Sequence, residues 1–333
     1  MSDCGCGNEC GTGAPVSEAP LIRVIDSHHR VGCNVPLQST LVKTLDQASS
    51  RGSHCVQFFM GGNQNYQVRK FNPKDLKSAE TYCQKWGKSI YVHCPLIANL
   101  SRDPSSQDEK TKKMLQRSWQ SVESEVKQMN GLPASCILHM GSNGSITNLI
   151  KNLNDFNVPR NRWISQNKLL CLENSAGSGS QIGYNFEDIR QIYEGLDRNT
   201  IGFCLDTQHV FGAGVNRLSS HEDVVKLFDD MEEAYGGKPD VIHLNDSLKT
   251  YRSKVDRHGI LGKGYIWSES DEGLKSLLDY CYSEDIDCIL ETPDMLGDLH
   301  RVRTKYMDLQ TIDCYPSSKQ KYSKHSKQKY SKI

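Results

Sequence analysis

The chain lacks three features that would quickly assign it to a class of protein. None of its apolar runs approaches membrane-spanning length, so we expect no membrane-bound form. Residues 1–20 lack the basic start and apolar stretch of a secretion signal. The formal net charge is zero, so overall charge gives no sign of a nucleic-acid-binding protein. Apolar residues make up 37% of the 333, which is enough for the core of one large barrel or two ordinary domains.

Cysteine is not scarce, but its distribution does not suit a disulfide framework. The thirteen cysteines are odd in number, and many lie inside apolar runs, such as Cys55, Cys136, Cys171, Cys204 and Cys288. Buried free thiols are typical of a reducing compartment. We therefore expect an intracellular protein, and the sequence does not distinguish nucleus from cytoplasm.

The zero net charge hides an uneven distribution. Residues 1–20 carry −3 and residues 314–333 carry +6, which leaves −3 for the segment between them. The first segment is rich in Gly and Cys without periodicity, and we expect a flexible tail there, with metal binding by its cysteines as the less favoured alternative. The last segment repeats SKQKYSK, and we expect a disordered basic tail that is a solubilising extension, a phosphate-binding arm or a nuclear address.

Between the tails, residues 21–313 are predicted to form one domain of repeated strand and helix units. Eight short, nearly continuous apolar runs are typical of parallel strands buried on both faces. These runs are 21–26, 54–59, 89–93, 135–139, 169–173, 201–206, 240–246 and 287–291. Helical patterns fit between them, for instance at 38–51, 111–129, 185–196 and 221–236. The pattern predicts an α/β fold, a (β/α)8 TIM barrel, although periodicity alone leaves an open doubly wound sheet as the alternative.

Imidazole or carboxylate groups follow seven of the eight predicted strands. In chain order these are His28 with His29, His93, His139, Glu173, Asp206 with His209, His243, and Glu291. In a parallel barrel all carboxyl ends of the strands meet at one face. One such histidine is more often structural than a ligand, but that explanation does not cover a whole set. The set therefore predicts a metal cluster at this face, and its mixed nitrogen and oxygen ligands favour zinc over manganese or iron.

The segment KVDRHGILGKG (254–264) adds two more candidate ligands from a loop. Asp256 and His258 are two residues apart, so in extended chain they point the same way and can hold one ion. With these, the nine candidate ligands are His93, His139, Glu173, Asp206, His209, His243, Asp256, His258 and Glu291. If one carboxylate bridges, nine ligands suffice for three ions with water in the remaining positions.

Three long blocks resemble the endonuclease IV family of apurinic/apyrimidinic (AP) endonucleases, over about residues 21–295. They are LENSAGSGSQIGY (172–184), GFCLDTQHVFGAG (202–214) and IHLNDSLKTYRSKVDRHGILGKG (242–264), and the shorter ILHMGS (137–142) and ILETP (289–293) match more loosely. The resemblance implies a zinc-dependent barrel hydrolase of base excision repair. Its partner would be double-stranded DNA that contains abasic sites, and we expect a monomer. It would cut 5′ to the abasic site and leave 3′-hydroxyl and 5′-deoxyribose phosphate ends, with removal of 3′ blocking groups as a further activity.

The resemblance also assigns roles to the candidate ligands. His93, His139 and Glu173 would hold one zinc ion, and Glu173 would bridge to a second. That second ion would also be held by Asp206, His243 and Glu291, and a third by His209, Asp256 and His258. Glu173 would be the catalytic residue that orients the attacking water.

The DNA-contacting loops depart from the family. MGGNQNY (60–66) would enter the groove with Asn63 and Gln64, where the family commonly has an arginine at the place of Gln64. Leu96 and Ile97 would form an apolar wedge, where the family has an aromatic residue after the third-strand histidine. HHRVGCN (28–34) is a weak match to the family pattern, and its His28 would be the family histidine near the site. The alternative for all of these loops is an ordinary surface turn. Two alternatives remain: a divalent-metal sugar isomerase or epimerase on the same barrel, and a non-catalytic DNA-binding module that uses the lysine tail.

Overall fold

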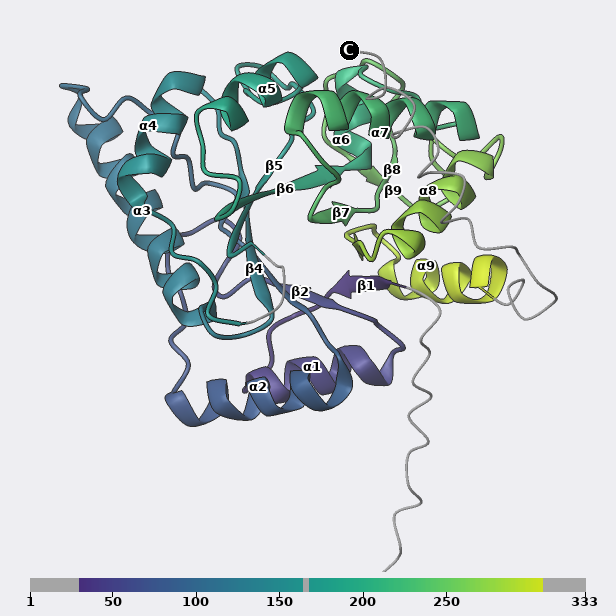
Figure 1. Cartoon of the computed structure of the whole chain (residues 1–333), viewed down its shortest axis with the longest axis horizontal. Helices are drawn as coiled ribbons and strands as arrows, with labels where there is room; N and C mark the ends of the chain where they lie inside the picture. Colours follow the sequence, from purple (N-terminus) through teal and green to yellow (C-terminus); the bar gives the residue numbers. More distant parts are fainter. Residues whose placement is uncertain (1–29, 164–167, 308–333) are drawn as a thin grey trace, which may run out of the picture.

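The structure, a computed structural model, describes residues 30–163 and 168–307 (Figure 1). The predicted tails at 1–20 and 314–333, the predicted strand at 21–26 and His28 all lie outside these residues.

Eight parallel strands close into a barrel. In chain order they are β1 (Val31–Asn34), β2 (Val56–Phe58), β3 (Ile90–His93), β4 (Ala134–His139), β5 (Leu170–Glu173), β6 (Ile201–Asp206), β7 (Val241–His243) and β10 (Asp287–Leu290). Around the barrel their order is β1-β10-β7-β6-β5-β4-β3-β2, with every pairing parallel. The predicted TIM barrel is therefore confirmed, and the open doubly wound sheet is wrong because β1 pairs with both β2 and β10.

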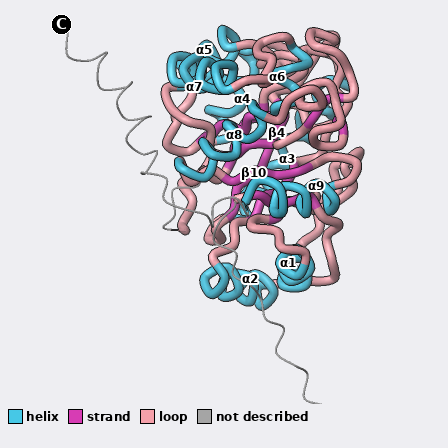
Figure 2. Tube along the Cα trace, turned by 90° about the vertical axis from the view of Figure 1, so that its right-hand side faces the viewer, coloured by secondary structure: helices cyan, strands magenta, loops and turns pink. Residues whose placement is uncertain are grey.

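Helices follow the strands and surround the barrel (Figures 1 and 2). They are α1 (Leu41–Ser50), α2 (Pro73–Trp86), α3 (Glu109–Met129), α4 (Ile146–Phe156), α5 (Phe186–Glu194), α6 (Thr207–Ala213), α7 (His221–Tyr235), α8 (Glu272–Ser283) and α9 (Met295–Val302), which continues into a π-helix at Arg303–Met307. The predicted helices at 38–51, 111–129, 185–196 and 221–236 correspond to α1, α3, α5 and α7. Their starts are set by polar side chains that accept a backbone N–H of the first turn: Thr40, Asp108, Asn185 and Ser220.

The first barrel strand is VGCN at Val31–Asn34, where the sequence predicted no strand. The alternative interpretation of this segment as an ordinary surface turn is wrong. Strand β1 pairs through Val31 with Cys288 of β10 and through Cys33 with Val56 of β2. The apolar signal was weak because Gly32 interrupts it, and the barrel requires glycine there. A Cβ atom at Gly32 would lie 2.1 Å from the carbonyl oxygen of Cys55.

Strand alternation arranges the barrel interior in layers. Seven buried residues, one at each strand except β1, form their own cluster inside the barrel: Cys55, Tyr91, Ile137, Cys171, Cys204, Val241 and Ile289. The residues between them in sequence join the larger core under the helices. Two positions farther along each strand, on the same inner face, are Gln57, His93, His139, Glu173, Asp206, His243 and Glu291. The apolar layer therefore supports a polar layer at the carboxyl ends of the strands.

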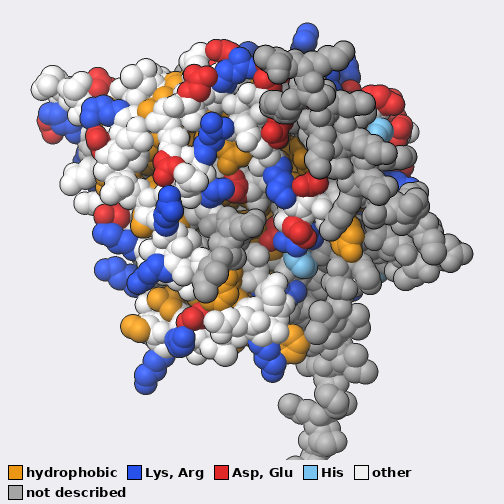
Figure 3. Space-filling view, viewed as in Figure 1, with side chains coloured by type: hydrophobic (Ala, Val, Ile, Leu, Met, Phe, Trp, Pro, Cys, Tyr) orange, Lys and Arg blue, Asp and Glu red, His pale blue; other side chains and the backbone are white. Residues whose placement is uncertain are grey.

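The described residues include nine cysteines and nine α-helices. All nine cysteines in this part of the chain are free and buried, which confirms that the cysteines of the apolar runs are thiols. None of the described helices is long and apolar enough to cross a membrane. Where described atoms are visible in Figure 3, charged side chains of both signs are scattered and apolar side chains lie in small groups.

Candidate metal centre

The nine predicted ligands meet at the carboxyl ends of the strands. Six of them lie at strand ends, and His209 lies in the first turn of α6. The other two, Asp256 and His258, come from a loop that a two-stranded antiparallel sheet closes, β8 (Asp246–Ser247) with β9 (His258–Gly259). Asp206 itself caps α6, because its carboxylate accepts the backbone N–H of His209 at 2.8 Å.

Glu173 lies at the centre of this cluster and is almost fully buried. Its Oε1 is 3.0 Å from His243 Nδ1 and 3.5 Å from His209 Nδ1. Its Oε2 is 3.2 Å from His139 Nε2 and 3.4 Å from His93 Nε2. Each carboxylate oxygen therefore faces a different pair of imidazoles, which is the arrangement of a bridging ligand.

Two groups of residues that could hold a cation share Glu173. Ligand atoms of His93, His139 and Glu173 lie within 4.8 Å of one another, and so do those of Glu173, Asp206, His243 and Glu291. These are the two sets that the sequence prediction assigned to the first and second ions. Asn245 supports the second set, because its amide donates to Asp206 Oδ2 at 2.7 Å.

A third group combines Asp206 with His209 and His258, whose ligand atoms also lie within 4.8 Å of one another. The sequence prediction placed Asp256 rather than Asp206 in this group. Asp256 also contacts this group: one of its oxygens lies 3.3 Å from His209 Nε2 and the other 3.3 Å from His258 Nε2. Its side chain is more exposed than those of the two histidines. Asp206 therefore stands between the second and third groups, and Asp256 closes the third.

The buried carboxylate at the centre is held in its ionised form by its neighbours. Burial alone would raise the pKa of Glu173, but the charges of His243 and His139 outweigh burial and hold this pKa well below its usual range. Two buried atoms of the cluster, Glu173 Oε2 and His258 Nε2, make close contacts with oppositely charged groups, to His139 at 3.2 Å and to Asp256 at 3.3 Å, but form no hydrogen bond of regular geometry among the described residues. Such orphaned atoms fit a site that is built for a cation.

The imidazoles show the complementary effect. Burial lowers the pKa of His258, but the Asp256 carboxylate 3.3 Å away and the charge of Asp206 raise this pKa to about 9. Burial also lowers the pKa of His209, whereas Asp206 and Asp256 raise it well above its ordinary value. Without a metal ion, protons on the histidines balance the carboxylates, and bound divalent cations would take the place of those protons. The mixed imidazole and carboxylate donors suit zinc.

Second nitrogens of three histidines are fixed by backbone carbonyls. His93 Nδ1 lies 2.7 Å from the carbonyl oxygen of Cys94, and His209 Nδ1 lies 2.8 Å from that of Asn174. His258 Nδ1 lies 3.3 Å from the carbonyl oxygen of Glu291. Acceptors of this kind keep Nδ1 protonated and leave Nε2 as the ligand atom.

Comparison with known proteins decides the family. The sequence pattern described as "Xylose isomerase-like TIM barrel" matches residues 45–303. A probable endonuclease 4 from Mycoplasmoides gallisepticum is 32% identical over 256 residues, which covers 73% of this chain and 78% of that protein. The chain belongs to the endonuclease 4 family.

Two further proteins place the chain among its relatives. Apurinic-apyrimidinic endonuclease 1 of Plasmodium falciparum is 29% identical over 247 residues, which covers 72% of this chain and 40% of that protein. The crystal structure of endonuclease IV from Thermus thermophilus superposes with a TM-score of 0.69 at 22% identity, covering 84% of this chain and 99% of that one. The second likeness concerns the fold alone.

In this endonuclease 4 family member, four of the five predicted DNA-contacting residues lie on two touching loops. Asn63 and Gln64 are exposed after β2, while Leu96 is 38% exposed and Ile97 half-buried after β3. The backbone N–H of Leu96 donates to the carbonyl of Asn63 at 2.9 Å. Both loops follow carboxyl ends of strands, so they lie on the same face as the metal groups. His28, the fifth residue, is outside the described part of the chain.

A cationic loop beside the metal groups was missed by the sequence prediction. Residues 248–257, between β8 and β9, carry four exposed cations: Lys249, Arg252, Lys254 and Arg257. The loop is held against α6, because backbone N–H groups of Arg252 and Lys254 donate to the carbonyls of Phe211 and Gly212. The signal was present in LKTYRSKVDR, but only its metal-ligand candidates were considered.

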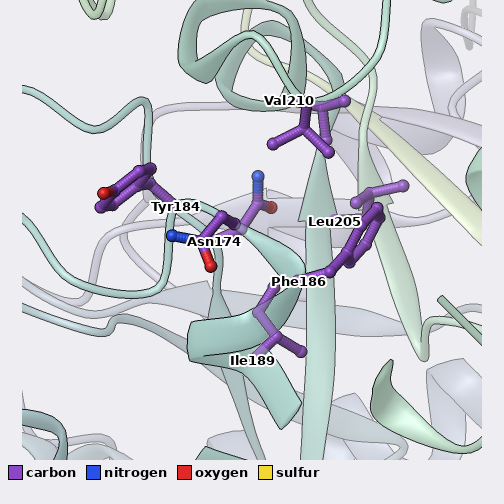
Figure 4. Close-up of a pocket in the computed structure, with 8 residues that line it drawn as sticks. Asn174, Tyr184, Phe186, Ile189, Leu205 and Val210 are labelled. Carbon is purple, nitrogen blue, oxygen red and sulfur yellow. The ribbon is translucent and has the colours of Figure 1, made fainter. Parts of the chain in front are cut away.

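A small pocket behind β5 and β6 is not part of the site. Asn174, Tyr184, Phe186, Ile189, Leu205 and Val210 line it (Figure 4). Its free volume of about 10 Å³ has room for one water molecule at most.

Proposed function

We propose that the chain is a zinc-dependent AP endonuclease that hydrolyses the DNA phosphodiester 5′ to abasic sites. The observation that carries the proposal is the arrangement around Glu173, in which overlapping groups of imidazoles and carboxylates meet on one face of an endonuclease 4 family barrel. The predicted ligand sets are retained for three Zn²⁺ ions, with Asp206 between the second set and the third. The products are 3′-hydroxyl and 5′-deoxyribose phosphate ends, and removal of 3′ blocking groups belongs to the same proposal.

The chemistry needs no protein nucleophile. When bound, the ions supply Lewis acidity and lower the pKa of a water towards neutrality. Glu173 orients this attacking water from the centre of the cluster. Its Oε2 faces His93 and His139, and its Oε1 faces His209 and His243. The barrel holds the ligands rigidly, since each strand-end residue stands on a buried apolar neighbour two positions earlier. No covalent intermediate with the protein is expected.

DNA recognition is assigned to the loops around this face. An abasic nucleotide is the least costly kind to extrude from the duplex, because no base has to be unpaired or unstacked. Leu96 and Ile97 fill the gap from one loop, and Asn63 and Gln64 approach the groove from the loop that touches it. The cations of residues 248–257 contact phosphates, which gives sequence-independent affinity.

An incision assay tests the proposal. The substrate is a duplex oligonucleotide with one abasic residue, and wild type is compared with Glu173→Gln and Glu291→Gln. Both variants should lose incision by several orders of magnitude, because each substitution removes a metal ligand and Glu173→Gln also removes the carboxylate that orients the water. Glu187→Gln on the exposed face of α5 is the matched control and should cut normally. A chelator should stop wild type, and zinc should restore it. If both glutamine variants cut as well as wild type, the assigned roles are wrong.

The sugar isomerase or epimerase alternative shares the barrel, as the description of the matching family itself indicates. The third group around His209, Asp256 and His258 favours the nuclease, because a one-ion or two-ion isomerase does not need it. Isomerisation of a free ketose by the purified protein would favour the alternative. Deletion of 314–333 tests the non-catalytic alternative: we expect weaker DNA affinity, most visibly at low salt, and not its loss.

We also propose the domain boundaries, the oligomeric state and the compartment of the protein. Residues 21–313 form the catalytic domain, 1–20 and 314–333 are tails, and the protein acts as a monomer in an intracellular, reducing compartment. The nine buried free thiols of residues 30–163 and 168–307 support a reducing compartment. Limited proteolysis should leave one fragment that begins before β1 and ends after the π-helix at Arg303–Met307. The mass of the intact protein in solution should be that of one chain.

A further inference from the structure

His243 differs from the three histidines whose second nitrogen meets a backbone carbonyl. Its Nδ1 faces the cluster, 3.0 Å from Glu173 Oε1, and its Nε2 lies 2.9 Å from the side-chain oxygen of Gln57. The partner of His243 is therefore a side chain, which substitution can remove without altering the backbone. No role was assigned to Gln57 from the sequence.

Gln57 occupies the position of a ligand without being one. It lies on β2, two residues after Cys55, in the layer that also holds His93, Glu173 and His243. Its side chain is fully buried. Its amide nitrogen donates to Glu291 Oε1 at 2.6 Å. The other oxygen of that carboxylate, Glu291 Oε2, lies 3.2 Å from His243 Nδ1 and faces the cluster.

Amide chemistry permits one arrangement of these contacts. An ionised carboxylate only accepts hydrogen bonds, so the side that faces Glu291 has to be the NH2 group of Gln57. The carbonyl oxygen then faces His243 and accepts from Nε2–H. This bond fixes the tautomer in which Nδ1 has a free lone pair. One side chain thereby presents Nδ1 of His243 and Oε2 of Glu291 to the same point.

We propose that Gln57 is a positioning residue, which holds His243 and Glu291 in place for the divalent ion of the group Glu173, Asp206, His243 and Glu291. The inference rests on the proposed metal-dependent function. Asn245, two residues after the end of β7, makes the corresponding contacts: its amide nitrogen donates to Asp206, and its oxygen accepts the backbone N–H of Glu291 at 3.0 Å. Two neutral amides thus orient ligands of one ion without adding charge to the site.

The test measures zinc binding by Gln57→Met, a substitution of similar length that removes both hydrogen bonds. Tyr91→Phe is the matched control. It also removes a buried hydrogen bond inside the barrel, to Asp287, but Tyr91 lies in the apolar layer below the metal ligands. Zinc affinity is measured by competition with a chromophoric chelator, and thermal unfolding is measured with zinc and with the chelator alone. We expect one ion to bind roughly 10- to 100-fold more weakly to Gln57→Met, as for other residues that orient metal ligands. The rise in Tm on adding zinc should shrink accordingly, whereas Tyr91→Phe should keep the wild-type affinity.

A measurement on wild type keeps the inference testable if Gln57→Met does not fold. In zinc-loaded protein, nitrogen-15 NMR of the histidine rings should show Nε2 of His243 protonated and Nδ1 bound to metal, with the signal assigned by its absence from His243→Gln. Unchanged zinc affinity in Gln57→Met, or Nε2 as the ligand atom in wild type, would overturn the role of Gln57. Wild type that binds no zinc at all would instead overturn the proposed function.

Discussion

Asp246 accepts a hydrogen bond from the backbone N–H of Gly262 at 2.9 Å, across the whole loop that carries Asp256 and His258. The same buried carboxylate also accepts the N–H groups of Gly264 at 3.1 Å and Ile266 at 3.0 Å. The side chain of Asp246, the first residue of β8, therefore fixes the segment that follows the loop and β9. The geometry of the third ligand group depends on that anchor.

Replacement of Asp246 should both destabilise the protein and loosen the third group. In Asp246→Asn one oxygen becomes an NH2 group that faces backbone donors, so at least one buried N–H loses its acceptor. We expect the free energy of unfolding to fall by about 3 kcal/mol, typical of a lost charged hydrogen bond with an unsatisfied partner. Urea unfolding measures the loss, and zinc titration should show one weakened ion.

Asp155→Asn is the control for that substitution. Asp155 is exposed on α4, where it pairs with Lys151, so its replacement should change the free energy of unfolding by less than about 0.5 kcal/mol. Equal effects of the two substitutions would mean that the Asp246 carboxylate does not anchor the loop.

Glu125 predicts an unusual dependence of stability on pH. This residue of α3 is almost fully buried, and its Oε2 has no hydrogen-bond partner among the described residues. Burial raises the pKa of Glu125 to about 8, although a hydrogen bond with the Cys94 thiol lowers this pKa. Between about pH 4.5, where an unfolded glutamate ionises, and about pH 8, the folded state holds one proton more than the unfolded state. The free energy of unfolding should therefore fall as pH rises through this range.

Glu125→Gln should remove that dependence, because glutamine is neutral at every pH. Near pH 4.5 the variant should be about as stable as wild type, and above pH 8 it should be more stable by a few kcal/mol. Denaturant unfolding at several pH values measures both. Glu123→Gln, on the same helix but half-exposed, should follow wild type throughout. Parallel curves for wild type and Glu125→Gln would show that Glu125 is ionised in the fold.

The sequence predicted the barrel and its ligand face because both depend on patterns that one chain displays. Nearly continuous apolar runs indicate strands, and ionisable residues after seven of the eight runs indicate a shared face. Residues without such a pattern were missed. Gly32 interrupts the apolar signal of β1 because it packs against Cys55. Gln57 looks like any polar residue in a strand, and only the closed barrel shows that it faces His243 and Glu291.

Cations of the loop between β8 and β9 should set the salt dependence of DNA binding. Lys249 and Arg257 are exposed, and each phosphate contact removed should lower the slope of log affinity against log salt by about 0.9. The variant Lys249→Ala with Arg257→Ala should therefore bind abasic and intact duplex more weakly by similar factors. Lys151→Ala, on the outer face of α4, is the control and should leave the slope unchanged. A variant that loses affinity for abasic duplex alone would assign these residues to lesion recognition instead.

Leu96 should affect incision only on duplex substrates, where the stack of bases has to be held open at the abasic site. It is 38% exposed, and its link to Asn63 is through the backbone, so Leu96→Ala should leave stability within about 0.5 kcal/mol of wild type. Incision of an abasic duplex should fall about tenfold, equivalent to about 1.4 kcal/mol of lost transition-state stabilisation. Tyr282→Ala, which removes a similarly exposed side chain at the end of α8, should cut normally. An abasic single strand has no opposing strand to wedge apart, so both variants should cut it as wild type does. A tenfold loss on the single strand as well would mean that Leu96 supports the metal groups and does not enter the duplex.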